Sequence, residues 1–489
     1  ANGGAGAVFL EYFRDVGVPY VRVVIPAPPG ASRFGASVAV GDLNGDAFDD
    51  IVVGAPGNTS TDRGSWYVYF GQPFSASPPQ LAYPGKFGAL TDRLGKSVAI
   101  TPDMNGDGLD DILVGAPGSN YVDFHEGLQG ALLFVQFGIL QDSFGDLVVG
   151  GDFNGDGIGD MAARYQTNVP GLGGRAAFAA YATAPGLAPG GLLSSIKTTS
   201  PTLSFFTAAA AGDTDLDGND EIVLGDVNAS PSGLTQAGRL SIWQPNTGLI
   251  TDSKFGGTVA DSLGFIVASA GDINGDGSPD VMGAAKVTDR IEFQAGDSPA
   301  GACIGGESLG TDRSPLSGVT MDSMVALDRN GDGFVDYAVA DDNGATATVK
   351  IVSHANLQRS LSSTVSKISA SGGGAPLFLR AGPAAAGNTY FLAASDALSA
   401  TGFPLDDGSI VPLDVTTTLL VTSLNNPTLL FPNNLGALDA NGNALSRIET
   451  CSLTFDPALM GAQIHVAYAT IGSSGTGHAS TVLSFELVP

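Results

Sequence analysis

The sequence of 489 residues is poor in cysteine and contains no long apolar segment. Its two cysteines, Cys303 and Cys451, form no Cys-x-x-Cys motif, which argues against a zinc or redox site. One disulfide between them and two unpaired buried thiols are equally open. The longest apolar stretches, such as residues 130–140, are too short and too interrupted by glycine to span a membrane. We therefore expect no membrane insertion.

Basic residues are also few. The chain has 21 lysines and arginines against 49 aspartates and glutamates, which gives a formal net charge of −28. A surface of this charge repels the phosphate backbone of nucleic acids and anionic lipid headgroups. We therefore predict no nucleic-acid partner, and we expect cations to be the natural small ligands. The negative charge is concentrated in residues 1–354, where one short motif repeats.

Residues suited to catalysis are scarce as well. The four histidines, His125, His354, His465 and His478, form no His-Glu-x-x-His or other metal-binding spacing. Residues 306–310, Gly-Glu-Ser-Leu-Gly, match the Gly-x-Ser-x-Gly nucleophile motif. That motif requires a turn from a strand into a helix, for which the sequence gives no signal. We predict no catalytic residue and no enzymatic activity.

The sequence is rich in glycine and proline, with 69 and 28 residues, and 43% of its residues are apolar. This composition indicates a folded chain with many turns. Few stretches show the periodicity of an amphipathic helix, so we expect an all-β protein. The length exceeds what one hydrophobic core usually serves, which favours two domains or one large modular domain.

A short acidic motif occurs six times. The stretch Asp-Leu-Asn-Gly-Asp-Ala-Phe-Asp-Asp returns at starts 49 to 61 residues apart, and its copies are residues 42–50, 103–111, 152–160, 213–221, 272–280 and 328–336. A short apolar run precedes and follows each copy, and another run rich in aromatic or β-branched residues comes later. Each unit is therefore predicted to be four antiparallel strands with the acidic loop between the first two. That is one blade of a β-propeller.

The two ends of the propeller are expected to meet. Residues 6–13 and 20–28 have the pattern of later strands in a unit but no acidic loop before them. We predict that they are the outer strands of the last blade, with inner strands from about 355–380, so that seven blades close a ring without exposed sheet edges. If that segment is no half-blade, six blades remain. The propeller would then occupy residues 1–380.

The acids within each loop are spaced to surround a cation. Positions 1, 3, 5 and 9 are Asp, Asn or Glu, and their charges would repel one another strongly without a positive ion between them. Position 7 varies freely, as expected if only its backbone carbonyl binds. Calcium accepts about six to eight oxygens at flexible distances, whereas magnesium, the second choice, requires a tighter octahedron. We predict up to six Ca²⁺ sites with these ligands: Asp42, Asn44, Asp46, Phe48, Asp50; Asp103, Asn105, Asp107, Leu109, Asp111; Asp152, Asn154, Asp156, Ile158, Asp160; Asp213, Asp215, Asp217, Asn219, Glu221; Asp272, Asn274, Asp276, Ser278, Asp280; Asp328, Asn330, Asp332, Phe334, Asp336.

Neither an EF-hand nor an empty acidic turn accounts for the loops as well as a calcium site in a propeller blade. An EF-hand needs a bidentate Glu at position 12 between helices, but position 12 is Val53, Val114 and Ala163 in the first three copies. An acidic turn without metal would explain one copy, but six copies in matching strand context favour calcium. The copies are unequal, because Ala47 occupies position 6, where the others have glycine and a positive φ is expected. Glu221 replaces Asp at position 9 of the fourth copy.

Residues 33–57 and 93–118 resemble FG-GAP repeats, the unit of the integrin α-subunit propeller and of many secreted bacterial proteins. In the first segment, Phe34-Gly35 and Gly54-Ala55-Pro56 enclose the acidic loop. The resemblance covers about residues 1–353, although later copies lose the Gly-Ala-Pro. It implies a propeller in which this loop joins the first two strands of a blade and binds calcium through positions 1, 3, 5, 7 and 9.

Residues 381–489 lack the motif and alternate strand-like runs with Gly, Pro and Asn turns, so a small β-sandwich is expected after the propeller. The sequence begins with Ala1 rather than methionine. This start fits a mature chain after signal-peptide removal, and trimming would explain it equally well. Together with the FG-GAP resemblance it leads us to expect a secreted or cell-surface protein.

For function, we expect an extracellular, calcium-stabilised binding, adhesion or scaffold protein that holds a protein or glycan ligand on the propeller face away from the metals. One alternative is a self-assembling surface or filament subunit, which would be a homo-oligomer. Another is a calcium-dependent polysaccharide lyase or hydrolase, for which Arg164, Tyr165 and Gln166 replace the Gly-Ala-Pro of the first two copies. Trp66 and Trp243 lie on strand patterns and are expected to pack in the core.

Overall fold

The structure is a computed structural model that describes the chain in segments. They are residues 4, 6–12, 21–57, 62–72, 78–138, 143–169, 173–184, 187–197, 207–271, 278–286, 290–294, 296, 308–312, 323–327, 336–342, 347–352, 361–362, 367–369, 374–380, 387–395, 398–404, 410–413, 435–438, 443–449, 463–472, 475–479 and 483–488. Regular structure in these segments is β-strand throughout, apart from one 3-10 turn, η1, at Pro231–Gly233. The prediction of an all-β chain is confirmed.

Five successive sheets have four antiparallel strands each, in the order of the sequence. Their strands are β3 (Ser37–Gly41), β4 (Asp50–Ala55), β5 (Ser65–Tyr69), β6 (Leu81–Phe87); β7 (Ser97–Thr101), β8 (Asp111–Ala116), β9 (Tyr121–His125), β10 (Leu132–Phe137); β11 (Val148–Gly151), β12 (Asp160–Val169), β13 (Gly173–Ala184), β14 (Leu187–Lys197); β15 (Thr207–Gly212), β16 (Glu221–Asp226), β17 (Arg239–Gln244), β18 (Leu249–Phe255); and β19 (Leu263–Gly271), β20 (Asp280–Ala285), β21 (Arg290–Gln294), β22 (Ser308–Asp312). Three further strands, β23 (Ser323–Leu327), β24 (Asp336–Asp342) and β25 (Ala347–Val352), form the next sheet. Each acidic motif joins the first strand of its sheet to the second, as predicted.

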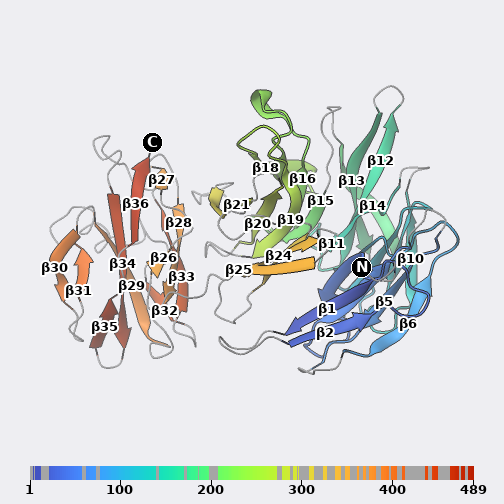
Figure 1. Cartoon of the computed structure of the whole chain (residues 1–489), viewed down its shortest axis with the longest axis horizontal. Coiled ribbons are helices and arrows are strands. Elements are labelled where there is room, and N and C mark those ends of the chain that lie inside the picture. The colour runs from blue at the N-terminus through green and yellow to red at the C-terminus, as the bar shows by residue number, and fades with distance from the viewer. Residues whose placement is uncertain are drawn as a thin grey trace.

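The sheets are arranged as blades around a common centre. The first strands of neighbouring sheets lie side by side, from β3 to β7, β11, β15, β19 and β23 in turn. Figure 1 shows the sheets following one another in this order, with the chain colour running from blue to orange. This arrangement of four-stranded sheets is that of a β-propeller. It brings the acidic loops of successive blades to the same end of the molecule.

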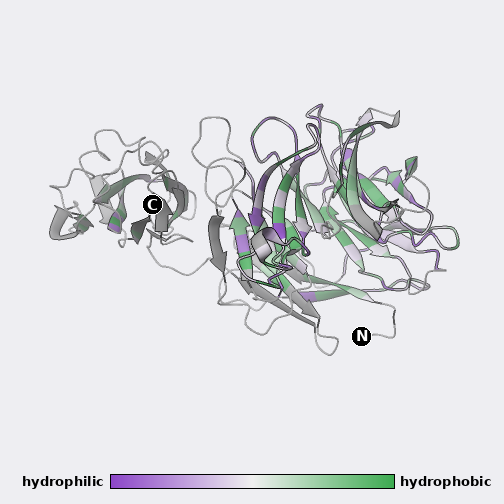
Figure 2. Ribbon diagram, turned by 90° about the horizontal axis from the view of Figure 1, so that it is seen from above, coloured by the Kyte–Doolittle hydropathy of each residue, from purple (hydrophilic) through white to green (hydrophobic). Residues whose placement is uncertain are grey.

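The second strand of a blade is buried on both faces, because it lies between two neighbouring sheets. Every residue of β4, β8, β16 and β20 is buried. On β8, Ile112 and Val114 share a core with Trp66 of the preceding sheet, whereas Leu113 packs with Met161 of the following sheet. This explains why the sequence shows continuous apolar runs here instead of alternation. Figure 2 shows hydrophobic residues along strands of the blades.

Both tryptophans belong to these cores between sheets. Trp66 packs with the second sheet, and Trp243 packs against Phe178 of the third sheet. Each has a relative exposure of 0%, so the prediction that they are packing residues is confirmed. A buried aromatic side chain of this size stabilises the fold by roughly 1.5–3 kcal/mol or more.

An N-terminal hairpin, β1 (Ala7–Tyr12) and β2 (Val21–Pro26), packs against the first sheet. Val8 and Ile25 share a core with Ile51 of β4. The parallel bridges Gly6↔Phe34, Gly64↔Leu94 and Gly238↔Leu263 show that β1 precedes β3 as β5 precedes β7 and β17 precedes β19. The hairpin therefore stands where the third and fourth strands of a preceding blade would stand. Ring closure and the number of blades stay predictions.

The C-terminal strands form separate sheets to one side of the blades (Figure 1). One sheet contains β26 (Leu361–Ser362), β28 (Gly374–Arg380) and β33 (Asn443–Glu449); another contains β27 (Lys367–Ser369), β36 (Leu483–Val488), β34 (Gln463–Gly472), β29 (Thr389–Ser395) and β32 (Leu435–Ala437), with β35 (Gly475–Ala479) beside β34; a third pairs β30 (Leu398–Pro404) with β31 (Ile410–Leu413). That these sheets pack as a sandwich, with a domain boundary after residue 380, stays a prediction.

One expected pairing is wrong. We predicted that residues 355–380 supply the inner strands of the last blade. Instead, β28 pairs with β33, and β27 pairs in parallel with β36, both in the C-terminal sheets. Leu377 and Leu379 are fully buried there. Their alternating apolar pattern predicts a strand but does not identify its partner. Both cysteines, Cys303 and Cys451, lie outside the described residues.

Candidate metal centres

The first four acidic loops are described in full, and the last two only in part. Of the fifth, the structure describes Ser278 and Asp280, and of the sixth, Asp336. The remaining predicted ligands lie outside the described residues: Asp272, Asn274, Asp276, Asp328, Asn330, Asp332 and Phe334. The structure therefore describes four complete loops. Each loop follows the first strand of its sheet, and its side-chain oxygens lie within one turn.

The position-1 carboxylate organises the turn. Oδ1 of Asp103 accepts hydrogen bonds from the backbone N–H groups of Asn105, Gly106 and Asp107, at 3.1, 2.6 and 3.2 Å, and Oδ2 accepts one from Gly108 at 2.6 Å. The same pattern recurs in the first loop, where backbone donors, Ala47 first, hold the pKa of Asp42 below its ordinary value. The carboxylate of a single aspartate thus accepts the backbone N–H groups of four residues, at positions 3 to 6, and closes the turn around itself.

This turn requires left-handed backbone at positions 4 and 6. Gly106 and Gly108 both have φ of +85°, and Gly157 has φ of +79°. Ala47 adopts φ of +68° at the position where the other copies have glycine, so the predicted backbone is confirmed. The fourth loop places Leu216 at position 4 with φ of +58°. Such residues cost about 1 kcal/mol each relative to glycine.

The position-9 acid connects the loop to the rest of the blade. Asp50, Asp111, Asp160 and Asp280 all have a relative exposure of 0%. One oxygen accepts the N–H of position 2, at 2.9 Å for Asp50, 2.8 Å for Asp111 and 3.1 Å for Asp160. The other accepts an N–H from the end of the third strand or the residues just beyond it: Gly71, Gly127, Thr183 and Gly296, at 2.6, 3.2, 2.7 and 3.0 Å.

These partners of position 9 were not predicted from the sequence, although a signal exists. Gly71, Gly127 and Gly296 each stand two residues beyond a third strand. A Cβ atom at any of them would lie within 2.1–2.4 Å of the position-8 carbonyl oxygen, so only glycine fits without a shift of backbone. Recurring glycine at this offset from the acidic motif would have indicated that the two loops touch.

Burial and neighbouring charge both disfavour ionisation of the position-9 acids. Desolvation is the main cause, and the carboxylates at positions 1 and 5 add to it, raising the pKa of Asp111 to about 6 and that of Asp160 to about 7. The pKa of Glu221 rises further, to about 8, through desolvation and the charges of Asp215 and Asp217. Carboxylates placed in this way require a positive partner to be ionised together at neutral pH.

The fourth loop fits a cation most clearly. Ligand oxygens of Asp213, Asp215 and Glu221 all lie within 4.8 Å of one another. Oε2 of Glu221 accepts hydrogen bonds from the N–H and hydroxyl of Thr214, at 2.7 and 2.8 Å. Its Oε1 is buried and has no hydrogen-bond partner among the described residues. An ionised oxygen left in this state is costly, whereas calcium accepts just such hard oxygen ligands.

The first three loops have asparagine at position 3, where the fourth has Asp215. Within the described segments, no group of three acids in these loops converges as in the fourth. Both kinds of loop share the backbone bonds to position 3: Asn44 Oδ1 accepts from Asp46 N–H at 2.9 Å, and Asp215 Oδ1 accepts from Asp217 N–H at 3.1 Å. Each loop still offers carboxylate and amide oxygens in one turn, which is the donor set that calcium prefers.

An EF-hand is excluded by position 12. Val53, Val114 and Ala163 lie on β4, β8 and β12, and each has a relative exposure of 0%. Strands flank the loops on both sides, as predicted.

Two of the three residues proposed for a lyase, Arg164 and Tyr165, make structural contacts. The guanidinium of Arg164 pairs with Asp146, which also lies 3.8 Å from the Lys96 ammonium nitrogen. Tyr165 packs against the core between the second and third sheets. His125 is buried, with Nδ1 3.2 Å from the Gly130 carbonyl oxygen. None of these contacts favours catalysis.

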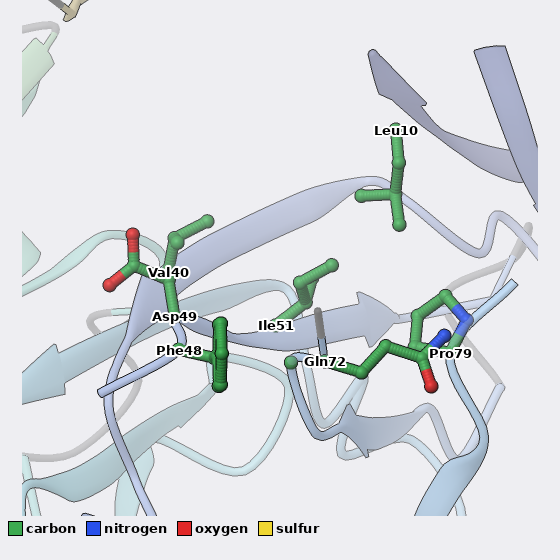
Figure 3. A pocket seen from close by; sticks show the side chains of 8 residues that line it. Leu10, Val40, Phe48, Asp49, Ile51, Gln72 and Pro79 are labelled. Atoms are coloured by element: carbon green, nitrogen blue, oxygen red, sulfur yellow. The ribbon is translucent and has the colours of Figure 1, made fainter. Parts of the chain in front are cut away.

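A pocket of 290 Å³ adjoins the first loop, between the N-terminal hairpin and the first sheet. Figure 3 shows its lining, in which Leu10 comes from β1, Val40 and Ile51 from β3 and β4, and Phe48 and Asp49 from the acidic loop. Its walls are mainly apolar. Because Phe48 occupies position 7, the variable side chain of the loop shapes this pocket while its backbone remains part of the turn.

The comparisons with known proteins agree with the repeat pattern. The family model described as FG-GAP repeat matches residues 34–69 and 94–131, which contain the first two acidic loops. These two segments are FG-GAP repeats. The mouse integrin alpha-3 chain is 33% identical over 133 residues, which cover 26% of this chain and 12% of that protein. Human phosphatidylinositol-glycan-specific phospholipase D is 33% identical over 125 residues, or 23% of this chain and 14% of that protein.

The chain thus matches only about an eighth of the length of these curated relatives. Among solved structures, the hydrazine synthase of Kuenenia stuttgartiensis is similar with a TM-score of 0.41 and 13% identity, over 68% of this chain and 86% of that one. In the part of the chain that the structure describes, no helix has the length and apolarity needed to cross a membrane.

Proposed function

We propose that this chain is a secreted or cell-surface binding module whose blades are held by structural calcium in the acidic loops. Glu221 carries the proposal. Its carboxylate is buried, it lies within 4.8 Å of the ligand oxygens of Asp213 and Asp215, and its Oε1 lacks a partner among the described residues. The FG-GAP repeats and the likeness to an integrin α chain support the extracellular, adhesion-type role.

In this proposal, calcium supplies the positive charge that lets the clustered carboxylates ionise together. The chain's own residues do the rest. The position-1 acid wraps the turn, and the position-9 acid connects it to the second strand and to the residues after the third. A metal bound at this junction would fix three strands of a blade relative to one another, so metal binding would add to folding stability.

The test is calcium removal from the purified full chain. Calorimetric scans in calcium and in excess chelator should differ by at least about 5 °C in Tm, because an ion that binds only the folded state stabilises it. Elemental analysis after dialysis should give up to six calcium ions per chain. Magnesium should restore less of the Tm than calcium. An unchanged Tm in chelator would contradict the proposal.

A partner would bind at the end of the blades away from the metal loops. Four cations of this strongly acidic chain lie near the starts of the first strands: Arg33, Arg93, Lys96 and Arg164. Lys96 and Arg164 share the single carboxylate of Asp146. Arg33 and Arg93 make no ion pair within the described residues. Uncompensated cations at this end favour an acidic glycan as the ligand.

Binding of polygalacturonate to the immobilised chain would test this surface. Replacing Arg33 and Arg93 together by glutamate should weaken binding at least tenfold, since two attractive charges become repulsive. Lys254→Glu, on β18 at the outer edge of the fourth sheet, is the matched control and should leave binding unchanged. Equal weakening by both changes would indicate a general charge effect and not this surface.

Self-association is the second candidate, and the first strand of the first sheet favours it. Val38 and Val40 of β3 are 45% and 57% exposed, whereas Val98, which matches Val38 on β7, is only 7% exposed. An apolar inner strand without cover is a site for another chain to pair or pack. Sedimentation velocity should then show calcium-dependent oligomers that Val40→Asp disperses. A monomer at all concentrations would remove this candidate.

A further inference from the structure

We propose that the third and fourth metal loops bind calcium as one coupled unit, and that Asp220 is the positioning residue that couples them. This inference rests on the proposed calcium sites. The backbone N–H of Asp220 donates to the carbonyl oxygen of Asp152 at 2.7 Å, and the N–H of Asp152 donates to Oδ2 of Asp220 at 2.9 Å. Asp152 is the position-1 ligand of the third loop. Asp220 stands at position 8 of the fourth, next to the position-9 ligand Glu221.

The two loops are also in direct contact. A Cβ atom at Gly155 of the third loop would lie 2.7 Å from the Gly218 carbonyl oxygen and 2.9 Å from Oδ1 of Asn219. The reciprocal hydrogen bonds and this close approach leave neither turn free to move without the other. The position-1 and position-9 ligands of neighbouring sites are thus linked through two backbone groups and one carboxylate.

Position 8 differs among the loops, and the linkage differs with it. Between the second and third loops, both within the described segments, a single bond of this kind is present there, from the N–H of Gly159 to the carbonyl oxygen of Asp103 at 3.1 Å. Glycine has no carboxylate that could accept a second bond in return. Between the fourth and fifth, position 8 is Pro279, which has no N–H to donate. Between the first and second, Asp110 makes no hydrogen bond to Asp42 within the described residues. The pair of loops three and four is therefore the most strongly connected of those described.

The coupling follows from the order that a metal imposes. Calcium in the fourth loop would fix Asp213, Asp215 and Glu221, and with them the adjoining Asp220. Asp220 would then hold both backbone groups of Asp152 in place before the third loop binds its own ion. The first ion to bind would order Asp152, and the second ion would then bind to a loop that is already ordered. Calcium in either loop should therefore raise the calcium affinity of the other loop by about tenfold.

Hydrogen exchange measured by mass spectrometry can follow each loop separately in a calcium titration of the full chain. Exchange in the third loop is read from a peptide that spans residues 152–160, and exchange in the fourth loop from one that spans residues 213–221. A peptide that spans residues 42–50 reports exchange in the first loop. Asp217→Asn removes one charged ligand from the fourth loop only. In this variant the calcium midpoint of the third loop should rise about tenfold, while the first loop is unchanged.

The decisive variants change Asp220. Asp220→Gly copies the residue found at position 8 of the third loop, and in this background Asp217→Asn should no longer shift the third loop. Asp220→Asn keeps an acceptor for the Asp152 N–H and should retain most of the shift. Asp110→Gly is the matched control and should change nothing in the third loop. A shift that persists in Asp220→Gly, or is absent from the parent, would overturn the inference.

The outcomes also separate this inference from the proposed function. If calcium protects no loop from exchange, the calcium sites themselves fail. If every loop is protected but the third and fourth titrate independently of each other, only the coupling fails. Circular dichroism of each metal-free variant confirms that the chain is folded before the titration is compared.

Discussion

The first and fourth loops share one backbone frame but satisfy their buried acids differently. In both, the position-1 aspartate accepts the N–H of position 6, at 2.9 Å for Asp42 and 3.0 Å for Asp213. The position-9 acid then differs. Both oxygens of Asp50 accept backbone N–H groups, from Leu43 and Gly71. Glu221 uses one oxygen for Thr214 and leaves the other without a protein donor in the described segments.

The residue that follows the third strand differs as well. Two residues beyond the third strand of the fourth blade stands Asn246, whose side chain bonds to Asn219 at 3.4 Å instead of to the position-9 acid. The comparison indicates that the frame depends on position 1, while position 9 decides how far the loop relies on a cation. Where both oxygens accept backbone donors, as at Asp50, the protein itself satisfies their hydrogen bonding. Where one oxygen has no donor in the described segments, as at Glu221, we propose that a cation satisfies it.

The largest expected effect separates these two kinds of position-9 acid. Asp50→Ala should lower the free energy of unfolding by about 3 kcal/mol, in calcium and in chelator alike. The change leaves the backbone N–H groups of Leu43 and Gly71 without their acceptor, and the Leu43 N–H is buried. Urea unfolding in both conditions measures it. Asp46→Ala, compared in chelator, is the control. Among the described residues the exposed Asp46 carboxylate accepts only the Phe48 N–H, so its loss should cost less than about 1 kcal/mol there. A loss confined to the calcium sample would contradict the comparison.

The next effect should depend on calcium. Glu221→Gln removes one charge from the cluster with Asp213 and Asp215. In calcium it should lower the free energy of unfolding by about 1–2 kcal/mol, because an anionic ligand is lost. In chelator at neutral pH the same variant should be within about 0.5 kcal/mol of the parent. Without a cation, desolvation and the neighbouring charges raise the pKa of Glu221 to about 8, so glutamine replaces a carboxyl that is mostly neutral. Denaturant melts in the two buffers test this difference, and equal destabilisation in both would mean that Glu221 is a structural acid like Asp50.

Most of the blade pattern could be predicted from the sequence, because each unit repeats both its apolar runs and its turn residues. The all-β class, the four-stranded sheets, the place of the acidic loops and the positive φ at Ala47 all follow from local pattern. Local pattern does not fix which strand pairs with which over long distances. This is why residues 355–380 were assigned to a closing blade although β28 pairs with β33.

The candidate site shows the same limit. The place of the acidic side chains within each turn could be predicted from spacing, but the contacts that distinguish one loop from another come from elsewhere in the chain. Gly71 reaches Asp50 from the end of the third strand, and Asp220 reaches Asp152 from the next blade. Such contacts depend on how sheets stack, which a nine-residue motif does not encode. The calcium itself remains a proposal.

The smallest effect concerns the frame that both loops share. Ala47 and Leu216 have φ of +68° and +58°, so Ala47→Gly and Leu216→Gly should each raise the free energy of unfolding by about 1 kcal/mol. Gly157→Ala is the matched reverse change. Its φ is +79° and no atom lies within 4 Å of the added Cβ, so a loss of about 1 kcal/mol there would be conformational alone. Thermal and urea unfolding in calcium measure all three. Destabilisation by Ala47→Gly would mean that the Ala47 methyl group makes a favourable contact. The first and fourth loops would then differ in how their turn backbone is stabilised as well as in charge.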